Sequence, residues 1–224
     1  TRVVMANSNY VAGLLRQIGI NPIVLYPPVR SRKILQIASR INWGDRERMV
    51  ITIARISPGK QLELIPLIAS KIKDAKFLLA GSLEHRGYYL DLLRLKRLLS
   101  AENFDILTNP DTSSLIKLLC SARIYFHTAR HEQFGIAIVE GMAAGCIPIV
   151  HRSGGPYCDI LAEKESSYGF AYNALEEAVS VIKDKIGGDH NSEELSDIVR
   201  ERSLIYDESS FSSRIRALVR NLLR

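Results

Sequence analysis

The sequence predicts an α/β fold: a Rossmann-like parallel sheet with helices on both faces and further helices at the C-terminal end. Short apolar stretches of strand length alternate along the chain with amphipathic segments that have helical spacing. The strand-like stretches are apolar throughout, which is typical of parallel strands buried on both faces. In such a fold a ligand lies beyond the carboxyl ends of the strands.

The predicted elements follow one another in strand–helix alternation. Strands are expected at residues 3–6, 24–26, 49–54, 77–80, 105–107, 124–127, 147–150 and 169–171. Helices are expected at residues 60–71, 87–100, 111–120, 134–144, 174–186, 192–206 and 211–223, with a short helix after residue 156. Local signals mark several boundaries, because Pro27 and Pro28 end an extended segment, Asp111 is a suitable N-cap and Gly145 stops a helix.

Charge and composition narrow the class of protein. The net charge is +6, from 30 basic and 24 acidic residues, which favours anionic partners. The basic residues are dispersed and few aromatics lie among them, so nucleic acid is not an expected partner. No apolar run approaches the roughly 18 residues of a membrane helix. Three cysteines without CxxC spacing argue against a disulfide framework or a zinc site and favour a reducing, cytoplasmic location.

Two glutamates belong to one predicted loop and helix. Glu132 precedes a helix that begins at Phe134 and Gly135, and Glu140 lies about one and a half turns inside it, so both carboxylates can face one crevice. Gly135 lets a ligand approach the backbone, and free N–H groups at a helix start suit an anion or a hydroxyl-rich ligand. The structural alternative is that Glu132 only complements the helix dipole and Glu140 is solvated.

Two cations lie at the predicted carboxyl edge of the sheet. Arg55 ends a strand, residues 58–59 form a turn, and Lys60 is expected to open a helix, so the two side chains could clamp a diphosphate. The alternative is a surface turn with two solvated cations.

The SGGP turn at residues 153–156 could form an anion-binding concavity, although tight turns need glycine in any case. No G-x-G-x-x-G fingerprint and no metal-ligand spacing of histidines is found, so neither a dinucleotide cofactor nor a metal is expected.

These motifs, in this order, resemble the C-terminal donor-binding domain of a retaining glycosyltransferase. The segment HEQFGIAIVEGMAAGCIPIV (131–150) and the SGGP turn are similar to glycosyltransferase family 4, the glycosyl transferases group 1, which has the two-Rossmann GT-B fold. The resemblance covers nearly the whole chain. Within the family, HTARHEQFGIAIVEGMAAG and HRSGGPYCDIL look closest to the α-1,2-mannosyltransferases that extend lipid-linked oligosaccharides from GDP-mannose.

The resemblance implies catalytic roles for three residues. Arg55 and Lys60 would bind the donor diphosphate and stabilise the leaving nucleotide, so that no metal and no cofactor is required beyond a GDP- or UDP-sugar as co-substrate. Glu132 would contact the donor sugar. Gln61 follows Lys60 where the family pattern usually has glycine, which is a departure from the motif.

The resemblance also implies donor-binding roles for five further residues. Phe134 and Gly135 would offer backbone N–H groups to the sugar, and Glu140 would accept hydrogen bonds from the ribose. Gly154 and Gly155 would lie near the phosphates.

The resemblance divides the chain into three parts. Residues 1–28 are expected to be the end of an acceptor-binding domain and a linker, residues 29–206 the donor-binding domain, and residues 207–224 a helix that crosses back to the first domain. The chain begins inside a predicted strand, so we expect that an N-terminal domain is missing. The expected partners are that domain, a nucleotide sugar and a glycan or lipid-linked acceptor, and the isolated chain should be inactive.

Two other functions fit the same motifs. A nucleotide-sugar epimerase of similar fold would bind the same donor but needs acid and base residues for proton abstraction or elimination. A non-catalytic nucleotide-sugar binding module is the second alternative, and it is tested by whether Arg55, Lys60 and Glu132 converge on one pocket.

The predicted last helix is amphipathic and basic. Its apolar stripe consists of Phe211, Ile215, Leu218, Val219, Leu222 and Leu223. Four arginines accompany the stripe with no acid among them: Arg214, Arg216, Arg220 and Arg224. The stripe could close this domain or pack on the missing one, and the charge also suits a peripheral contact with an anionic membrane surface.

Overall fold

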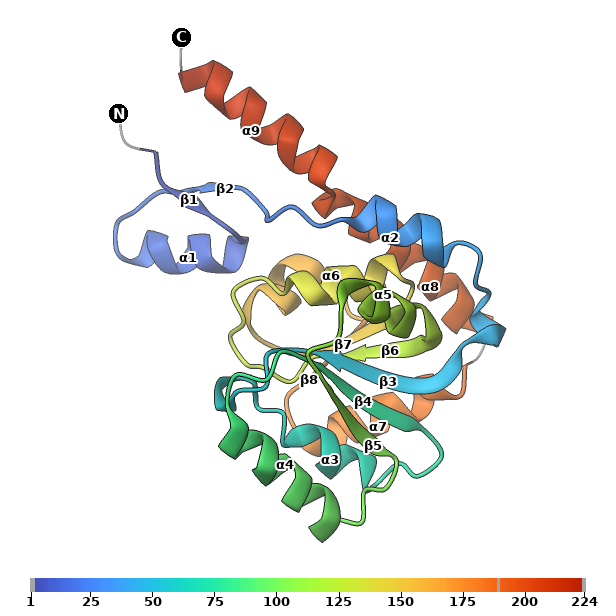
Figure 1. Ribbon diagram of the computed structural model, residues 1–224. Helices are drawn as coiled ribbons and strands as arrows, with labels where there is room; N and C mark the ends of the chain where they lie inside the picture. Colours follow the sequence, from blue (N-terminus) through green and yellow to red (C-terminus); the bar gives the residue numbers. More distant parts are fainter. Residues whose placement is uncertain (1–2, 189, 223–224) are drawn as a thin grey trace.

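A computed structural model describes residues 3–188 and 190–222 (Figure 1). Within these ranges the main sheet has six strands in the order β5-β4-β3-β6-β7-β8, and each neighbouring pair is parallel. The strands are β3 (Glu47–Ile53), β4 (Lys76–Gly81), β5 (Phe104–Thr108), β6 (Ala122–Phe126), β7 (Ile147–His151) and β8 (Phe170–Tyr172). The predicted Rossmann-like parallel sheet is therefore confirmed.

Helices cover both faces of this sheet (Figure 1). One face packs against α3 (Leu64–Ala69), α4 (Arg86–Leu98) and α7 (Leu175–Ile186). The other face packs against α2 (Ser31–Ala38), α5 (Thr112–Ser121), α6 (Ile136–Ala143) and α8 (His190–Ser203). Successive residues of β3 enter opposite layers: Val50 joins the first core, whereas Met49 and Ile51 join the second.

The N-terminal segment forms a small unit of its own, with β1 (Met5–Ala6) and β2 (Ile23–Val24) in a two-stranded parallel sheet and α1 (Asn9–Gln17) between them. One buried carboxylate joins this unit to the main domain. Asp159, in the π-helical turn η3 (Pro156–Ile160), accepts hydrogen bonds from the backbone N–H groups of Asn9 (2.7 Å) and Tyr10 (3.1 Å). An acceptor at this position satisfies the free N–H groups at the start of α1.

The chain ends in the 3-10 turn η4 (Leu204–Tyr206) and in α9 (Glu208–Leu222), which extends away from the sheet (Figure 1). No residue of α9 is buried within its described length, so the apolar stripe does not enter the core of this domain. Leu223 and Arg224, the last predicted members of the stripe and of the basic set, lie outside the described residues. In the part of the chain that the structure describes, no helix has the length and apolarity needed to traverse a bilayer.

Two predicted details differ from the structure. Lys60 does not open a helix: it ends the 3-10 turn η2 (Pro58–Lys60), Gln61 has a left-handed backbone with φ of 53°, and α3 begins only at Leu64. Helix α2 has no counterpart among the predicted elements, because its N-cap, Arg30, makes no side-chain capping bond and the segment is short. The 3-10 turn η1 (Trp43–Asp45) connects this helix to β3.

Candidate functional site

A cavity of about 360 Å³ opens at the carboxyl end of the sheet, where β3 and β6 lie side by side. After β3 the chain crosses to β4 on one side, and after β6 it crosses to β7 on the other, so these strands form the topological switch point at which α/β folds bind ligands. The lining residues come from both strand ends, the loop before α6, the first turn of α6 and the N-terminal segment: Asn7, Pro27, Ile53, Ala54, Arg55, Lys60, Tyr125, His127, Glu132, Gln133, Phe134, Gly135, Ile136, Ala137 and Ile138.

The two predicted cations both line this cavity but are held differently. Arg55 follows β3, its side chain is 63% exposed, and its guanidinium lies 3.3 Å from the carboxylate of Glu84. Lys60 is fixed more firmly, because the hydroxyl of Thr128, just after β6, donates a 2.5 Å hydrogen bond to the Lys60 carbonyl. The turn that carries Lys60 is therefore tied to the end of the neighbouring strand.

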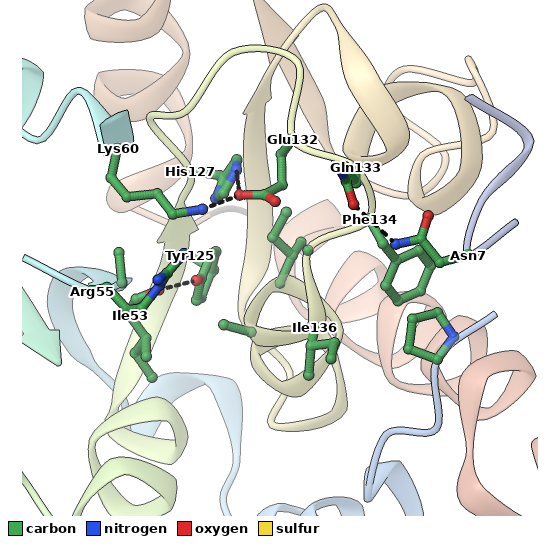
Figure 2. Close-up of a pocket in the computed structure, with 15 residues that line it drawn as sticks. Asn7, Ile53, Arg55, Lys60, Tyr125, His127, Glu132, Gln133, Phe134 and Ile136 are labelled. Atoms are coloured by element: carbon green, nitrogen blue, oxygen red, sulfur yellow. Dashed lines mark hydrogen bonds and ion pairs between the residues drawn. The ribbon is translucent and has the colours of Figure 1, made fainter. Parts of the chain in front are cut away.

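Lys60 and Glu132 meet across the cavity (Figure 2). The Lys60 ammonium donates a hydrogen bond to Oε2 of Glu132, and the two side chains are each 21% exposed. Burial alone would raise the pKa of Glu132, but the hydrogen bond and the charge of Lys60 outweigh it and hold that pKa below its ordinary value. Glu132 is therefore an anion at neutral pH.

A third polar side chain lies next to this pair. Nε2 of His127 is 3.9 Å from Oε2 of Glu132 and has no hydrogen-bond partner, although the residue is only 7% exposed (Figure 2). Burial lowers the pKa of His127 to about 4; the nearby charge of Lys60 also lowers it, and Glu132 opposes both. The imidazole is therefore neutral at neutral pH.

The start of α6 forms the opposite wall of the cavity. Gly135 is the N-cap, and its left-handed φ of 100° is a backbone conformation that residues with a side chain rarely adopt; a Cβ there would also lie 2.6 Å from the end of the Ile138 side chain. The ring of Phe134 is buried and stacks on Tyr26 at a centroid distance of 5.7 Å, so only its backbone is available to a ligand. This arrangement leaves the first N–H groups of α6 beside the cavity.

Glu140 lies one turn beyond Ile136 on the same side of α6 and is not part of the cavity lining. The side chain is half-buried, and burial raises the pKa of its carboxyl above the ordinary value, while the charge of Arg30 opposes this shift. The sequence predicted that Glu132 and Glu140 face one crevice. In the structure Glu132 lines the cavity, whereas Glu140 lies further along α6 and outside the lining.

Gly154 and Gly155 lie behind the cavity rather than in its lining, packed against the loop that carries Glu132. A Cβ on Gly154 would lie 2.5 Å from the Glu132 carbonyl oxygen, and a Cβ on Gly155 would lie 2.2 Å from that of Gln133. The N–H of Gly155 donates a 2.8 Å hydrogen bond to the Glu132 carbonyl. Because neither glycine carries a side chain, the SGGP turn can pack directly against the backbone of that loop.

The sequence analysis gave no role to His127 or Thr128, whereas the structure places His127 in the cavity lining and bonds the Thr128 hydroxyl to the turn of Lys60. Both residues directly follow β6, just as Arg55 follows β3. A polar residue at the end of a buried strand is therefore the sequence pattern that could have identified them. Among the residues that the structure describes, no group of three or more His, Cys, Asp or Glu side chains is arranged to hold a metal ion.

Comparison with known proteins places these residues in a family context. The family model of glycosyl transferases group 1 matches residues 34–201. The "GDP-Man:Man(3)GlcNAc(2)-PP-Dol alpha-1,2-mannosyltransferase" of Dictyostelium discoideum is 27% identical over 247 residues, covering 100% of this chain and 48% of that protein. The protein of the same name from Xenopus tropicalis is 32% identical over 164 residues, covering 68% of this chain and 34% of its own length.

Solved structures share the fold at lower identity. A glycosyltransferase from Rickettsia africae superposes with a TM-score of 0.84 at 18% identity, covering 100% of this chain and 64% of that one. The Anabaena protein HepE in complex with UDP-glucose superposes with a TM-score of 0.83 at 18% identity, covering 98% of this chain and 64% of that one. The chain thus spans about half the length of the Dictyostelium relative, and its fold is found within the GT-B glycosyltransferases.

Proposed function

The chain belongs to the family of glycosyl transferases group 1, and on this premise we propose that it is the donor-binding half of a glycosyltransferase. The proposed donor is GDP-mannose and the proposed acceptor a lipid-linked glycan, since both occur in the names of the relatives. The mannose would be transferred with retention of configuration. The acceptor-binding half would be supplied by the remaining length of such a protein.

The observation that carries the proposal is the convergence of Arg55, Lys60 and Glu132 on one cavity at the switch point. Arg55 and Lys60 belong to the connection after β3, whereas Glu132 belongs to the connection after β6, so solvated surface charges would have no reason to meet there. Two cations and one anion around a single cavity suit a ligand that is anionic at one end and rich in hydroxyl groups at the other. A nucleotide sugar has this composition.

The two cations would act on the diphosphate. When the bond between the sugar and the diphosphate breaks, negative charge develops on the leaving phosphate, and cations already in place stabilise it without a metal ion. Arg55 would use its planar fork and Lys60 its compact charge. A charge-assisted contact of this kind is worth about 1.5–3 kcal/mol.

Glu132 and the start of α6 would hold the sugar. A carboxylate accepts hydrogen bonds from two hydroxyl groups, and the free N–H groups around Phe134 and Gly135 donate to others. Glu140, one turn further along α6, would accept from the ribose hydroxyls. Gly154 and Gly155 would contribute by supporting the Glu132 loop against the phosphate side of the cavity.

The proposed acceptor would bring the protein to a membrane surface. The exposed arginines of α9 and its unburied apolar residues suit either the proposed acceptor-binding half or an anionic lipid surface. Co-sedimentation with phosphatidylserine vesicles at low and high salt separates the two, because a lipid contact of this kind weakens with salt. No sedimentation at low salt would leave the proposed acceptor-binding half as the partner of α9.

Titration calorimetry with GDP-mannose, UDP-glucose and ADP-glucose tests the proposed function. The chain should bind GDP-mannose with equal affinity in the presence and absence of EDTA, and Arg55→Ala and Lys60→Ala should each weaken binding by roughly 10- to 150-fold. Arg94→Ala is the matched control, because Arg94 is an exposed cation on α4 that pairs with Asp91. Failure to bind any of the three sugar nucleotides would reject the proposal.

A further inference from the structure

His127 has no assigned part in the proposed function, yet its position is closely controlled. Its backbone N–H donates to the Ile149 carbonyl at 2.9 Å, and its carbonyl accepts from the Tyr172 hydroxyl at 3.0 Å. These two bonds tie the backbone of His127 to β7 and β8, while the residue lines the cavity. Its Nε2 is buried without a hydrogen-bond partner, and a buried polar atom without a partner is costly.

The nearest acceptor for this nitrogen is Glu132. The 3.9 Å between Nε2 and Oε2 is too long for a hydrogen bond, but a shift of about 1 Å would bring the atoms to ordinary bonding distance. Lys60 bonds to the same oxygen, Oε2. With Lys60 in this place the carboxylate stays beyond hydrogen-bond distance of Nε2.

Donor binding changes this arrangement. In the proposed function, the diphosphate takes Lys60 as its partner, which weakens the bond between Lys60 and Glu132. A half-buried carboxylate that loses its cation needs another donor in order to remain fixed and ionised. The neutral imidazole of His127 is the adjacent group that can supply one.

We propose that His127 is a positioning residue that takes over Glu132 when the donor diphosphate draws Lys60 away, its Nε2–H donating to Oε2 of Glu132. This inference rests on the proposed function. It explains why an imidazole is buried next to the Lys60–Glu132 pair without being bonded to it. The charged groups that face His127 are Glu132 from the loop before α6 and Lys60 from η2.

Two substitutions separate the N–H group from the bulk of the ring. His127→Leu removes the donor and keeps an apolar volume, whereas His127→Gln can place an amide N–H near the position of Nε2. Titration calorimetry with GDP-mannose and with GDP should show that His127→Leu weakens GDP-mannose binding about tenfold and GDP binding less than twofold, because GDP has no sugar for Glu132 to hold. His127→Gln should recover most of the lost affinity.

A double-mutant cycle tests whether His127 acts through Glu132. In the Glu132→Ala background, His127→Leu should cost no further affinity for GDP-mannose, because the group that it positions is absent. His85→Leu is the matched histidine control, since His85 is exposed, accepts from the Tyr88 N–H at the start of α4 and does not line the cavity. Thermal denaturation of each variant verifies that it is folded.

Each contrary outcome points to a different failure. Unchanged GDP-mannose binding by His127→Leu, or equal losses for GDP and GDP-mannose, overturns the inference while the proposed function stands. Additive losses in the Glu132→Ala background also overturn it, since His127 would then contact the sugar directly. If the unsubstituted chain binds neither GDP nor GDP-mannose, the proposed function fails and the inference fails with it.

Discussion

Glu132 and Glu140 show how two identical residues on one helix–loop unit acquire different properties. Lys60 holds the pKa of Glu132 below its ordinary value against the effect of burial, so this carboxylate is firmly ionised. Glu140 has no cation in hydrogen-bond contact within the described residues, and burial raises its pKa. A carboxylate that is buried without a bonded cation is suited to accept hydrogen bonds from neutral hydroxyl groups.

This difference predicts separable effects on ligand binding. Glu140→Ala should weaken GDP and GDP-mannose binding alike, by about 1 kcal/mol or more, because both ligands carry the ribose. Glu132→Ala should spare GDP and weaken GDP-mannose by a similar or larger amount. Calorimetric titration of both variants with both ligands measures, for each variant, the loss of GDP affinity relative to the loss of GDP-mannose affinity. Equal losses for the two ligands in both variants would refute this division of roles.

The buried imidazole predicts a pH dependence of stability. The pKa of His127 is lowered from 6.5 to about 4, so between these values the unfolded chain binds a proton that the folded chain does not. The free energy of unfolding should therefore fall as the pH is lowered from 6.5 toward 4. Protonation of Glu132 lowers the free energy of unfolding further only as the pH falls below 4.5, because the folded state holds the pKa of this carboxyl below that value.

Urea denaturation of the unsubstituted chain and of His127→Gln between about pH 7 and pH 5 isolates the histidine. The substituted chain should have the flatter dependence of stability on pH in this range. Parallel curves would show that His127 does not contribute to the slope.

At this scale the sequence predicted which charged residues share one cavity better than how they contact one another. Arg55, Lys60 and Glu132 were identifiable because each follows or precedes a buried element. That Lys60 bonds to Glu132 was not predictable, since it depends on Gln61 adopting a left-handed backbone and on Thr128 holding the turn. Both are tertiary effects that leave no pattern in the local sequence.

Among the elements, the SGGP turn acts by supporting another loop. Gly155→Ala should shift the loop that carries Glu132, because the new Cβ would lie 2.2 Å from the Gln133 carbonyl oxygen and 3.0 Å from the Phe134 Cα. We expect a loss of stability of about 1–3 kcal/mol and weaker GDP-mannose binding. Gly44→Ala is the control, since nothing lies within 4 Å of the position that its new methyl group would take. Thermal denaturation should show a lower melting temperature for Gly155→Ala than for Gly44→Ala, and calorimetry should show weaker GDP-mannose binding. Equal stability and affinity of the two variants would contradict the supporting role of the turn.

The junction between α1 and η3 gives a second prediction about elements. Asp159→Ala would leave the N–H groups of Asn9 and Tyr10 without their acceptor and would also remove the 2.9 Å bond from the Tyr26 hydroxyl. Each unsatisfied group costs about 1–3 kcal/mol, so amide hydrogens of α1 should exchange faster while those of β3 keep their rates.

Asp197→Ala serves as the control for this junction. Asp197 is an exposed carboxylate that pairs with Arg200 on α8, and its removal should leave exchange in α1 unchanged. Unchanged exchange in α1 of the Asp159→Ala chain would show that the carboxylate does not hold the N-terminal unit.

Strands were more predictable than helix starts. The central strands of the main sheet contain short apolar runs, a pattern that burial on both faces imposes. Helix α2 has no capping side chain of its own, and one of its first N–H groups is satisfied from a distant part of the chain: the Arg32 N–H donates to the Asp207 carboxylate at 3.1 Å. A cap supplied from 175 positions along the chain leaves no local signal.

The whole molecule is organised around the switch point between β3 and β6. Parallel strands bring their carboxyl ends to one edge, and the opposite directions of the two crossovers leave the cavity uncovered there. That topology explains why residues from positions 55, 60, 127 and 132 meet. It provides a site for one ligand, whereas transfer of a sugar needs a second substrate held against the first.

The chain alone should therefore bind GDP-mannose yet transfer no mannose. Among the described residues, its N-terminal unit contributes β1, α1 and β2 alone, whereas a second Rossmann-like domain needs on the order of 100–150 residues. With one side of the cavity open to water, the anomeric carbon would not be held against an acceptor, and at most slow hydrolysis of the donor should occur. A radiolabelled-donor assay with mannose- and glucose-terminated acceptors, lipid-linked ones included, measures both reactions.

A longer chain that includes an acceptor-binding half, or that half added separately, should restore transfer, and this is the positive control. Robust transfer by the 224 residues alone would mean that the acceptor site is built from these residues themselves.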